Sequence, residues 1–331
     1  GILRGKVQEE KSIRIVGDYD IDGVCSTYIL LQAFERLGSD VDFEIPDRIK
    51  DGYGINESII EQAHADGVEV ILTCDNGISA FHQVELAKKY GMTVVITDHH
   101  EVPLDGEKEK IPPADAVIDP KQADCPYPFP EICGAVVAYK LVQVLYARRG
   151  VPQMEWLDLL EFAAIATVGD VMKLQDENRI LVKYGLKKMA QTKNLGLRRL
   201  AEKNNLDLGA ITAYHIGFVI GPCLNAGGRL KTAKEALALL RAQSEEEAER
   251  LAEELKELND TRKDMTEQGT EAAKLQVESW YQKDKVLVVF LPECHESLAG
   301  IIAGRLREYY QKPAIVLTRG EEAVKGSGRS I

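Results

Sequence analysis

The sequence lacks paired cysteines, long apolar runs and an excess of positive charge, and each absence excludes a class of protein. Its six cysteines are scattered and include no Cys-x-x-Cys pair. Even the closest two, Cys125 and Cys133, have a spacing that fits no common zinc motif. We therefore expect reduced thiols, as is usual in a cytosolic protein. No apolar run approaches the ~20 residues that a membrane-spanning helix needs.

The charge balance is acidic, with 41 lysines and arginines against 53 aspartates and glutamates, for a formal net charge of −12. Proteins that coat nucleic acid are usually basic, so this balance argues against that class but allows an enzyme with a local basic groove. A hydrophobic content of 45% over 331 residues is typical of a globular protein with more than one domain. The opening GILRGKVQEEK resembles neither a signal peptide nor a transit sequence, so we expect a cytoplasmic location.

Residues 13–26, IRIVGDYDIDGVCS, combine a strand pattern, three aspartates at alternate positions and the start of a helical pattern. Asp18, Asp20 and Asp22 therefore lie where a strand passes into a helix, which is where parallel α/β sheets bind ligands. Carboxylates this close repel one another unless a cation lies among them, and Mg²⁺ and Mn²⁺ prefer oxygen ligands. On this motif alone an Asp-rich turn remains the alternative.

Strand and helix patterns alternate along the first third of the chain. We expect strands at residues 13–16, 41–45, 68–73, 93–97 and 116–118, and helices at 24–37, 56–65 and 79–90, the last capped by Ser79. This alternation predicts an α/β fold with a doubly wound parallel sheet.

The rest of the chain is predicted to be mostly helical before a second α/β domain begins. Residues 132–201 have helical patterns, 211–230 are glycine-rich and expected to be irregular, and 244–283 have the near-heptad spacing of a long acidic helix. Strand, helix and strand patterns follow at 286–291, 298–310 and 314–318. We expect one domain over 1–243 with a helical insert, a connecting helix over 244–283, and the beginning of a second domain over 284–331. Because the pattern stops at GSGRSI in mid-domain, we interpret the chain as a fragment.

Acidic and imidazole groups end three of the first four predicted strands. Asp75 follows the third strand, and Asp98, His99 and His100 follow the fourth. Parallel strands bring their carboxyl ends to one edge, so these groups should meet the three aspartates of the first loop. Such an oxygen-rich set suits Mn²⁺ or Mg²⁺ better than structural zinc, and two ions about 4 Å apart would serve phosphoester hydrolysis. For a single histidine, an ordinary core or surface position is the alternative.

These motifs resemble those of the DHH phosphoesterases, and most closely the RecJ branch of single-strand-specific 5′→3′ exonucleases. The first four motifs correspond to DYDIDG at 18–23, DNG at 75–77, DHH at 98–100 and ATVGDV at 166–171. GPCLNAGGRL at 221–230 resembles the next RecJ motif. CHE at 294–296, GIIAGRL at 300–306 and GSGRS at 326–330 resemble the opening of a DHH-associated domain. The resemblance spans essentially the whole chain.

The resemblance implies two ions, Mn²⁺ or Mg²⁺, held by six residues: Asp18, Asp20, Asp22, Asp75, His99 and Asp170. It implies a catalytic group of Asp75, His99 and His100, in which Asp75 bridges the ions and His100 orients the phosphate or a leaving group. Many relatives have a histidine where this chain has Val16, which leaves the ligand set of one ion open.

The resemblance also implies a set of residues that bind DNA or phosphate: Arg48, Asn225, Arg229, His295, Ser327 and Arg329. Arginine suits bidentate phosphate recognition, and the backbone of a Gly/Ser turn around Arg329 would cradle a phosphate. The alternatives are a solvated charge for each arginine, a cap on its own glycine-rich turn for Asn225, and packing for His295. Tyr53, between two glycines, would stack on a base or pin its loop.

The implied function is a metal-dependent 5′→3′ exonuclease of single-stranded DNA that acts in DNA repair and recombination. We expect a monomer without membrane contact, with a single-strand-binding protein or a helicase as further candidate partners. One alternative is a nanoRNase or nucleoside-bisphosphate phosphatase of the same superfamily, although those relatives usually lack the helical insert and connecting helix. The other is a non-catalytic RecJ-like replication scaffold, which would typically lose metal ligands, whereas every expected ligand position is filled here.

Overall fold

The computed structural model describes residues 1–320 and 323–331. The described chain forms two compact units, one of residues 1–228 and 232–256 and one of residues 229–231 and 257–331. Each unit has a hydrophobic cluster of its own, so each is treated separately below. None of the described helices is both long enough and apolar enough to cross a bilayer.

A five-stranded parallel sheet forms the centre of the first unit. Its strands are β1 (Ile13–Val16), β2 (Val41–Glu44), β3 (Val70–Cys74), β4 (Thr93–Thr97) and β7 (Ala116–Ile118), in the order β2-β1-β3-β4-β7. Every adjacent pair is parallel. The connections change direction between β1 and β3, and ligands bind beyond the carboxyl ends of the strands at such a switch point. The prediction of a doubly wound sheet is confirmed.

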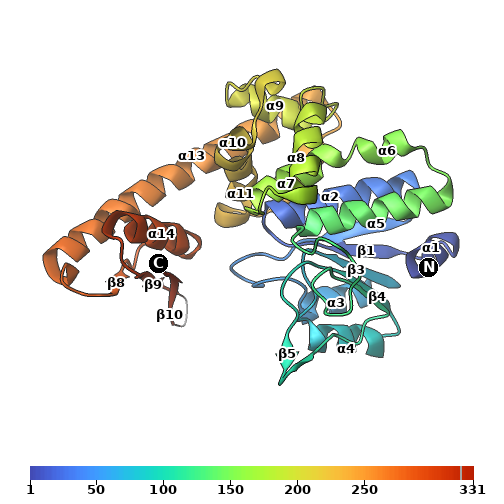
Figure 1. Cartoon of the computed structure of the whole chain (residues 1–331), viewed down its shortest axis with the longest axis horizontal. Coiled ribbons are helices and arrows are strands. Elements are labelled where there is room, and N and C mark those ends of the chain that lie inside the picture. Colours follow the sequence, from blue (N-terminus) through green and yellow to red (C-terminus); the bar gives the residue numbers. More distant parts are fainter. Residues whose placement is uncertain (321–322) are drawn as a thin grey trace. The chain divides into compact units, whose positions relative to one another are not determined.

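Helices cover both faces of this sheet (Figure 1). On one face lie α2 (Ile21–Arg36) and α5 (Gly134–Arg149), and on the other lie α3 (Glu57–Ala65) and α4 (Phe81–Lys89). All five residues of β3 are buried, which explains why its sequence VILTC does not alternate. The predicted Ser79 cap of α4 is wrong: the helix begins after Ala80 without a side-chain cap. The preceding turn is held instead by Asp98, whose Oδ2 accepts from the Ile78 N–H at 2.9 Å.

The helical insert is confirmed as α6 (Gln153–Leu157), α7 (Leu160–Gly169), α8 (Asp176–Met189) and α9 (Leu195–Lys203). The prediction that residues 211–230 are irregular is wrong. They form α10 (Ala213–His215), a π-helical turn η2 (Ile216–Ile220) and α11 (Gly221–Leu230), followed by α12 (Lys234–Arg241). The glycines of this segment allow close packing rather than turns, because a Cβ atom on Gly228 would lie 2.4 Å from the carbonyl oxygen of Tyr19.

The predicted long helix is confirmed as α13 (Glu245–Gln276), which the π-helical η3 (Val277–Tyr281) continues. After it come β8 (Leu287–Phe290), α14 (Ala299–Tyr310), β9 (Ala314–Arg319) and β10 (Val324–Arg329) in the second unit. The predicted Gly/Ser turn around Arg329 is wrong: this segment is β10, which pairs antiparallel with β9 in the register Gly326↔Leu317 and Ser327↔Val316. Backbone pairing with β9 therefore replaces the open turn.

Several short elements had no counterpart among the sequence predictions. They are α1 (Ile2–Gln8), a hairpin of β5 (Leu104–Asp105) and β6 (Lys108–Glu109), and the 3₁₀ turns η1 (Leu208–Ala210) and η4 (Glu296–Leu298). Elements this short carry too few residues for a periodic pattern to develop.

Packing of α7 against α8 depends on Gly185. A Cβ atom there would lie 2.2 Å from Cβ of Ala164 and 3.1 Å from the carbonyl oxygen of Leu160. We predict that Gly185→Ala lowers the free energy of unfolding by about 1–3 kcal/mol, because the helices must move apart. The matched control is Gly5→Ala in α1, where the nearest atom is 3.9 Å away and a gain of about 0.4–1 kcal/mol is expected. Urea denaturation measures both, and equal stabilities would contradict this view of the interface.

Candidate metal centre

The loop between β1 and α2 brings the first three aspartates together. Asp20 is the N-cap of α2, and its side chain accepts from the backbone N–H groups of Asp22 (2.9 Å) and Gly23 (3.1 Å). Position 23 must be glycine, because a Cβ atom would lie 2.3 Å from the carbonyl oxygen of Asp18. The turn is thus tight enough to bring Asp18, Asp20 and Asp22 to one edge of the sheet.

Asp22 is fully buried and links the loop to a second helix. Its two carboxylate oxygens accept from the N–H groups of Gly134 and Ala135, each at 2.7 Å, at the N-terminus of α5. A carboxylate is stabilised there by unpaired N–H groups and by the helix dipole. Each oxygen keeps a further lone pair, and Nε2 of His99 lies 3.4 Å from Oδ2.

Asp75 follows β3 in a left-handed backbone conformation, with φ at 62°. Non-glycine residues in this region carry strain that the surrounding structure must hold in place. Here the Asp75 N–H donates to the Thr97 carbonyl at 3.0 Å. The carboxylate faces His99, with Oδ1 3.0 Å from Nε2, and Gly134 leaves room for it, since a Cβ atom there would lie 2.7 Å from Cβ of Asp75.

Asp98 and His100 form a pair beside this cluster. Nδ1 of His100 lies 2.7 Å from Oδ1 of Asp98, and because a carboxylate only accepts, the imidazole donates. Burial alone would lower the pKa of His100, but the hydrogen bond and the charge of Asp98 outweigh it and raise that pKa. Asp98 itself is buried and also accepts from the His99 N–H at 2.7 Å. The sequence located Asp98 at this edge but gave it no role; its position directly before two histidines was the available signal.

All six predicted ligand residues lie in one cluster, together with His100. Three overlapping groups have ligand atoms within 4.8 Å of one another: Asp18, Asp20 and Asp75; Asp22, His99 and Asp170; and Asp75, His99 and His100. Asp170 joins from the C-cap of α7. Asp75 and His99 each belong to two of these groups.

Burial and mutual repulsion both disfavour the charged carboxylates of this cluster. Burial, followed by the charge of Asp20, raises the pKa of Asp18 to about 8. Burial and then Asp22 raise the pKa of Asp170 to about 7, while burial lowers the pKa of His99. Oδ1 of Asp18 and Oδ1 of Asp75 are buried and make no hydrogen bond within the described part of the chain. An oxygen-rich set with imidazole and uncompensated charge fits hard divalent cations.

Three of the residues predicted to contact DNA or its phosphates lie in the first unit. The Arg48 guanidinium lies 4.9 Å from the centre of the Tyr19 ring, in the aspartate loop. The Tyr53 hydroxyl donates to the Asp75 carbonyl at 3.0 Å and lies 3.1 Å from Nδ1 of His100, so this side chain pins its loop to the cluster. Asn225 does not cap its own turn: it lies in α11, and its Oδ1 accepts from the Ile21 N–H at 2.8 Å.

The other four residues predicted to contact DNA or its phosphates belong to the second unit. Arg229 donates to the Ser297 carbonyl at 3.1 Å, and Nδ1 of His295 lies 2.7 Å from the Ser297 hydroxyl. Arg329 donates to the Ser327 hydroxyl at 3.0 Å on β10. Their contacts with DNA stay predictions.

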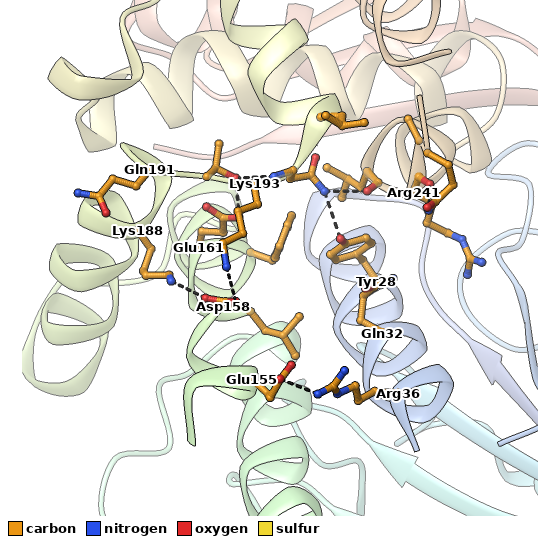
Figure 2. A pocket seen from close by; sticks show the side chains of 18 of the residues that line it. Tyr28, Gln32, Arg36, Glu155, Asp158, Glu161, Lys188, Gln191, Lys193 and Arg241 are labelled. Carbon is orange, nitrogen blue, oxygen red and sulfur yellow. Dashed lines mark hydrogen bonds and ion pairs between the residues drawn. The ribbon is translucent and has the colours of Figure 1, made fainter. Parts of the chain in front are cut away.

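A separate cavity of about 420 Å³ lies between α2, α7 and the loops before α9 and α13 (Figure 2). None of the cluster residues lines it. Its charged side chains form ion pairs, such as Lys188 with Asp158 at 2.5 Å and Arg36 with Glu155 at 2.6 Å. Glu161 lines this cavity and is 4% exposed. Its Oε1 accepts from the Thr192 hydroxyl at 2.7 Å.

The fold and this cluster define an α/β protein with an oxygen-rich metal centre at the switch point of its sheet. The model of the DHH family N-terminal domain matches residues 12–167. The single-stranded-DNA-specific exonucleases RecJ of Bacillus subtilis and Escherichia coli are 38% and 37% identical to the chain, covering 99% and 100% of it. The chain spans only 41% and 59% of their lengths.

Two solved structures have the same fold over the whole chain. RecJ from Thermus thermophilus in complex with Mn²⁺ superposes with a TM-score of 0.84 at 31% identity, over 46% of that chain. An exonuclease RecJ bound to manganese superposes with a TM-score of 0.86 at 32% identity, over 80% of that chain. The chain belongs to the DHH family and, within it, to the RecJ group.

Glu161 should make stability depend on pH. Burial, only partly offset by the Thr192 hydrogen bond, raises its pKa from 4.5 to about 7. The folded protein therefore holds this proton more tightly than the unfolded chain, and its contribution to stability falls by up to about 3 kcal/mol as pH rises through that interval. We predict that Glu161→Gln, which has no proton to lose, gains stability relative to the parent protein between about pH 5 and pH 8. Urea denaturation at both pH values measures this, and a constant difference would contradict it.

Proposed function

We propose that the chain carries the catalytic site of a metal-dependent exonuclease that hydrolyses single-stranded DNA from its 5′ end. The observation that carries this proposal is the convergence of Asp18, Asp20, Asp22, Asp75, His99 and Asp170 on one sheet edge. Membership of the RecJ group supports the substrate class, since the relatives are named as single-stranded-DNA-specific exonucleases. A role in DNA repair and recombination follows from the same relationship.

The proposed cofactors are two ions of Mn²⁺ or Mg²⁺. Asp18, Asp20 and Asp75 would hold one, and Asp22, His99 and Asp170 the other. The resemblance to the family makes Asp75 the candidate for a ligand shared by both. When bound, such ions polarise a phosphate and lower the pKa of a water molecule. The buried Oδ1 atoms of Asp18 and Asp75, which accept no hydrogen bond within the described residues, support this assignment, as do relatives solved with Mn²⁺ and with Mg²⁺.

The residues around the ions would position the substrate. Asp98 holds the His100 ring and favours its protonated form, so His100 can donate to a phosphate oxygen or a leaving oxygen. The Tyr53 hydroxyl contacts both the Asp75 carbonyl and the His100 ring, and so holds these two groups in place relative to each other. Arg48, whose guanidinium lies against the Tyr19 ring of the aspartate loop, is a candidate in the first unit for holding a 5′ phosphate.

We also propose the domain division 1–243, 244–283 and 284–331, as a DHH domain with its helical insert, a connecting helix and residues of a DHH-associated domain. The family match inside the first part and the uninterrupted helix from Glu245 support it. Arg229, His295, Ser327 and Arg329 would hold the incoming strand. A monomeric state, a cytoplasmic location and a helicase or single-strand-binding partner stay predictions from the sequence.

Single-stranded oligonucleotides labelled at either the 5′ or the 3′ end test the activity in the presence of Mn²⁺. We expect early release of labelled mononucleotide from the 5′ end alone, and none from a duplex. Asp75→Ala should lower kcat by about a hundred-fold or more, since even partners of metal ligands typically cost 10–100-fold. The matched control is Asp124→Ala, an exposed carboxylate outside the cluster, which should retain activity.

The other outcomes separate the alternatives. Cleavage only of di- and trinucleotides would favour a short-oligonucleotide hydrolase of the same superfamily. Binding of single strands without cleavage in either metal would favour a scaffold and overturn the proposal.

Asp98→Asn tests whether Asp98 acts through His100. We predict that kcat falls by about 10–100-fold while Mn²⁺ affinity changes little, because Asp98 belongs to none of the ligand groups. Asp75→Asn is the matched substitution and should weaken Mn²⁺ binding itself. Titration calorimetry with Mn²⁺ alone distinguishes them, and equal loss of affinity in the two variants would make Asp98 a ligand.

A further inference from the structure

Two aromatic side chains lie exposed and stacked at the start of the helical segment that packs on the aspartate loop. Tyr214 is 63% and Phe218 is 68% exposed. Their ring centres are 4.7 Å apart, and the planes meet at 26°. Single exposed apolar residues are ordinary, but adjacent ones form a patch that commonly marks a binding surface.

The same segment continues onto the candidate metal loop. Gly217, Gly221 and Asn225 follow Tyr214 along α10, the π-helical η2 and α11. A Cβ atom on Gly217 would lie 3.6 Å from Val168, near the end of α7 that carries Asp170. Asn225 accepts from the Ile21 N–H, between Asp20 and Asp22. At 1.5 Å per residue, Phe218 lies about 10 Å along the helix axis from Asn225.

The local structure holds this pair in place. Thr212 and His215 form a capping box at the start of α10, with the Thr212 N–H 3.1 Å from Nδ1 of His215. Ile216 and Ile220 are fully buried on the opposite side of η2. The segment includes a π-helical turn, a feature that is frequent at functional sites. Anchored aromatic faces lose little freedom when a planar group stacks on them.

We propose that Tyr214 and Phe218 form a stacking platform for a nucleobase of the single-stranded DNA, a few nucleotides from the phosphate that is cleaved. This inference rests on the proposed function. Every base has a π-face, so stacking supplies affinity without sequence preference. A strand whose phosphate lies at the metal cluster can extend along this segment within the first unit. The platform would therefore increase the affinity for long strands and not the affinity for dinucleotides, which are too short to reach it.

Steady-state kinetics on a dinucleotide and a dodecanucleotide test the platform in the whole chain. We expect the KM of the parent protein to fall with length. In the double variant Tyr214→Ala/Phe218→Ala, the KM for the dodecanucleotide should rise about ten-fold or more, as expected for a lost base stack, with little change in kcat. The aromatic-retaining Tyr214→Phe/Phe218→Tyr should restore the length dependence. The matched control is Tyr184→Ala, which removes another exposed tyrosine of the first unit and should change neither parameter.

An unchanged KM for the dodecanucleotide would overturn the platform, as would an equal rise for both substrates. Circular dichroism melting shows whether the double variant folds as the parent does. If the parent protein cleaves no strand, the proposed function fails on its own. Fluorescence anisotropy with the labelled dodecanucleotide then decides the platform, because the double variant must bind about ten-fold more weakly.

Discussion

Repulsion among five buried or half-buried carboxylates is the constraint on which the rest of the first unit depends. They meet at the carboxyl edge of the parallel sheet: Asp18, Asp20, Asp22, Asp75 and Asp170. Backbone N–H groups stabilise Asp20 at the start of α2 and Asp22 at the start of α5. Burial, and then the neighbouring carboxylates, still raise the pKa values of Asp18 and Asp170, so the charged forms of these two groups remain disfavoured. Divalent cations would supply the positive charge that the carboxylates need. Binding of these ions would then contribute both to the stability of the first unit and to its function.

This constraint explains where the helices end. α2 and α5 begin at the cluster and α7 ends there, so three helix termini supply either a carboxylate or the N–H groups that hold one. Such close packing of neighbouring residues against these helix ends requires glycine. A Cβ atom on Gly134 would meet Asp75, and one on Gly169 would lie 2.6 Å from Ile21. These glycines are required by tertiary packing and not by local turns. A sequence pattern cannot distinguish the two, so the glycine-rich residues 211–230 were wrongly predicted to be irregular.

The same helices also line the separate cavity. Tyr28 on α2 and Glu161 on α7 border it, while Asp22 and Asp170 of the same helices lie in the cluster. Movement of either helix would disturb both places at once. The buried carboxyl of Glu161, the ion-paired rim and the close α7–α8 contact at Gly185 make this part of the insert a scaffold for the metal centre. The stability of the helical insert and the geometry of the cluster are thus linked through α2 and α7.

The sequence by itself determined the parallel sheet and the metal cluster, because alternating strand and helix patterns align the strand ends that carry Asp18, Asp75 and His99. Local periodicity contains that information. Only the tertiary structure decided which distant side chains hold the cluster: the Tyr53 hydroxyl on the Asp75 carbonyl, and the Asn225 amide on the Ile21 N–H. The last pair is 204 residues apart, so no local pattern encodes it. Likewise, antiparallel pairing with β9 made a strand of the Gly/Ser segment at Arg329, since inter-strand hydrogen bonds outweigh the turn preference of glycine.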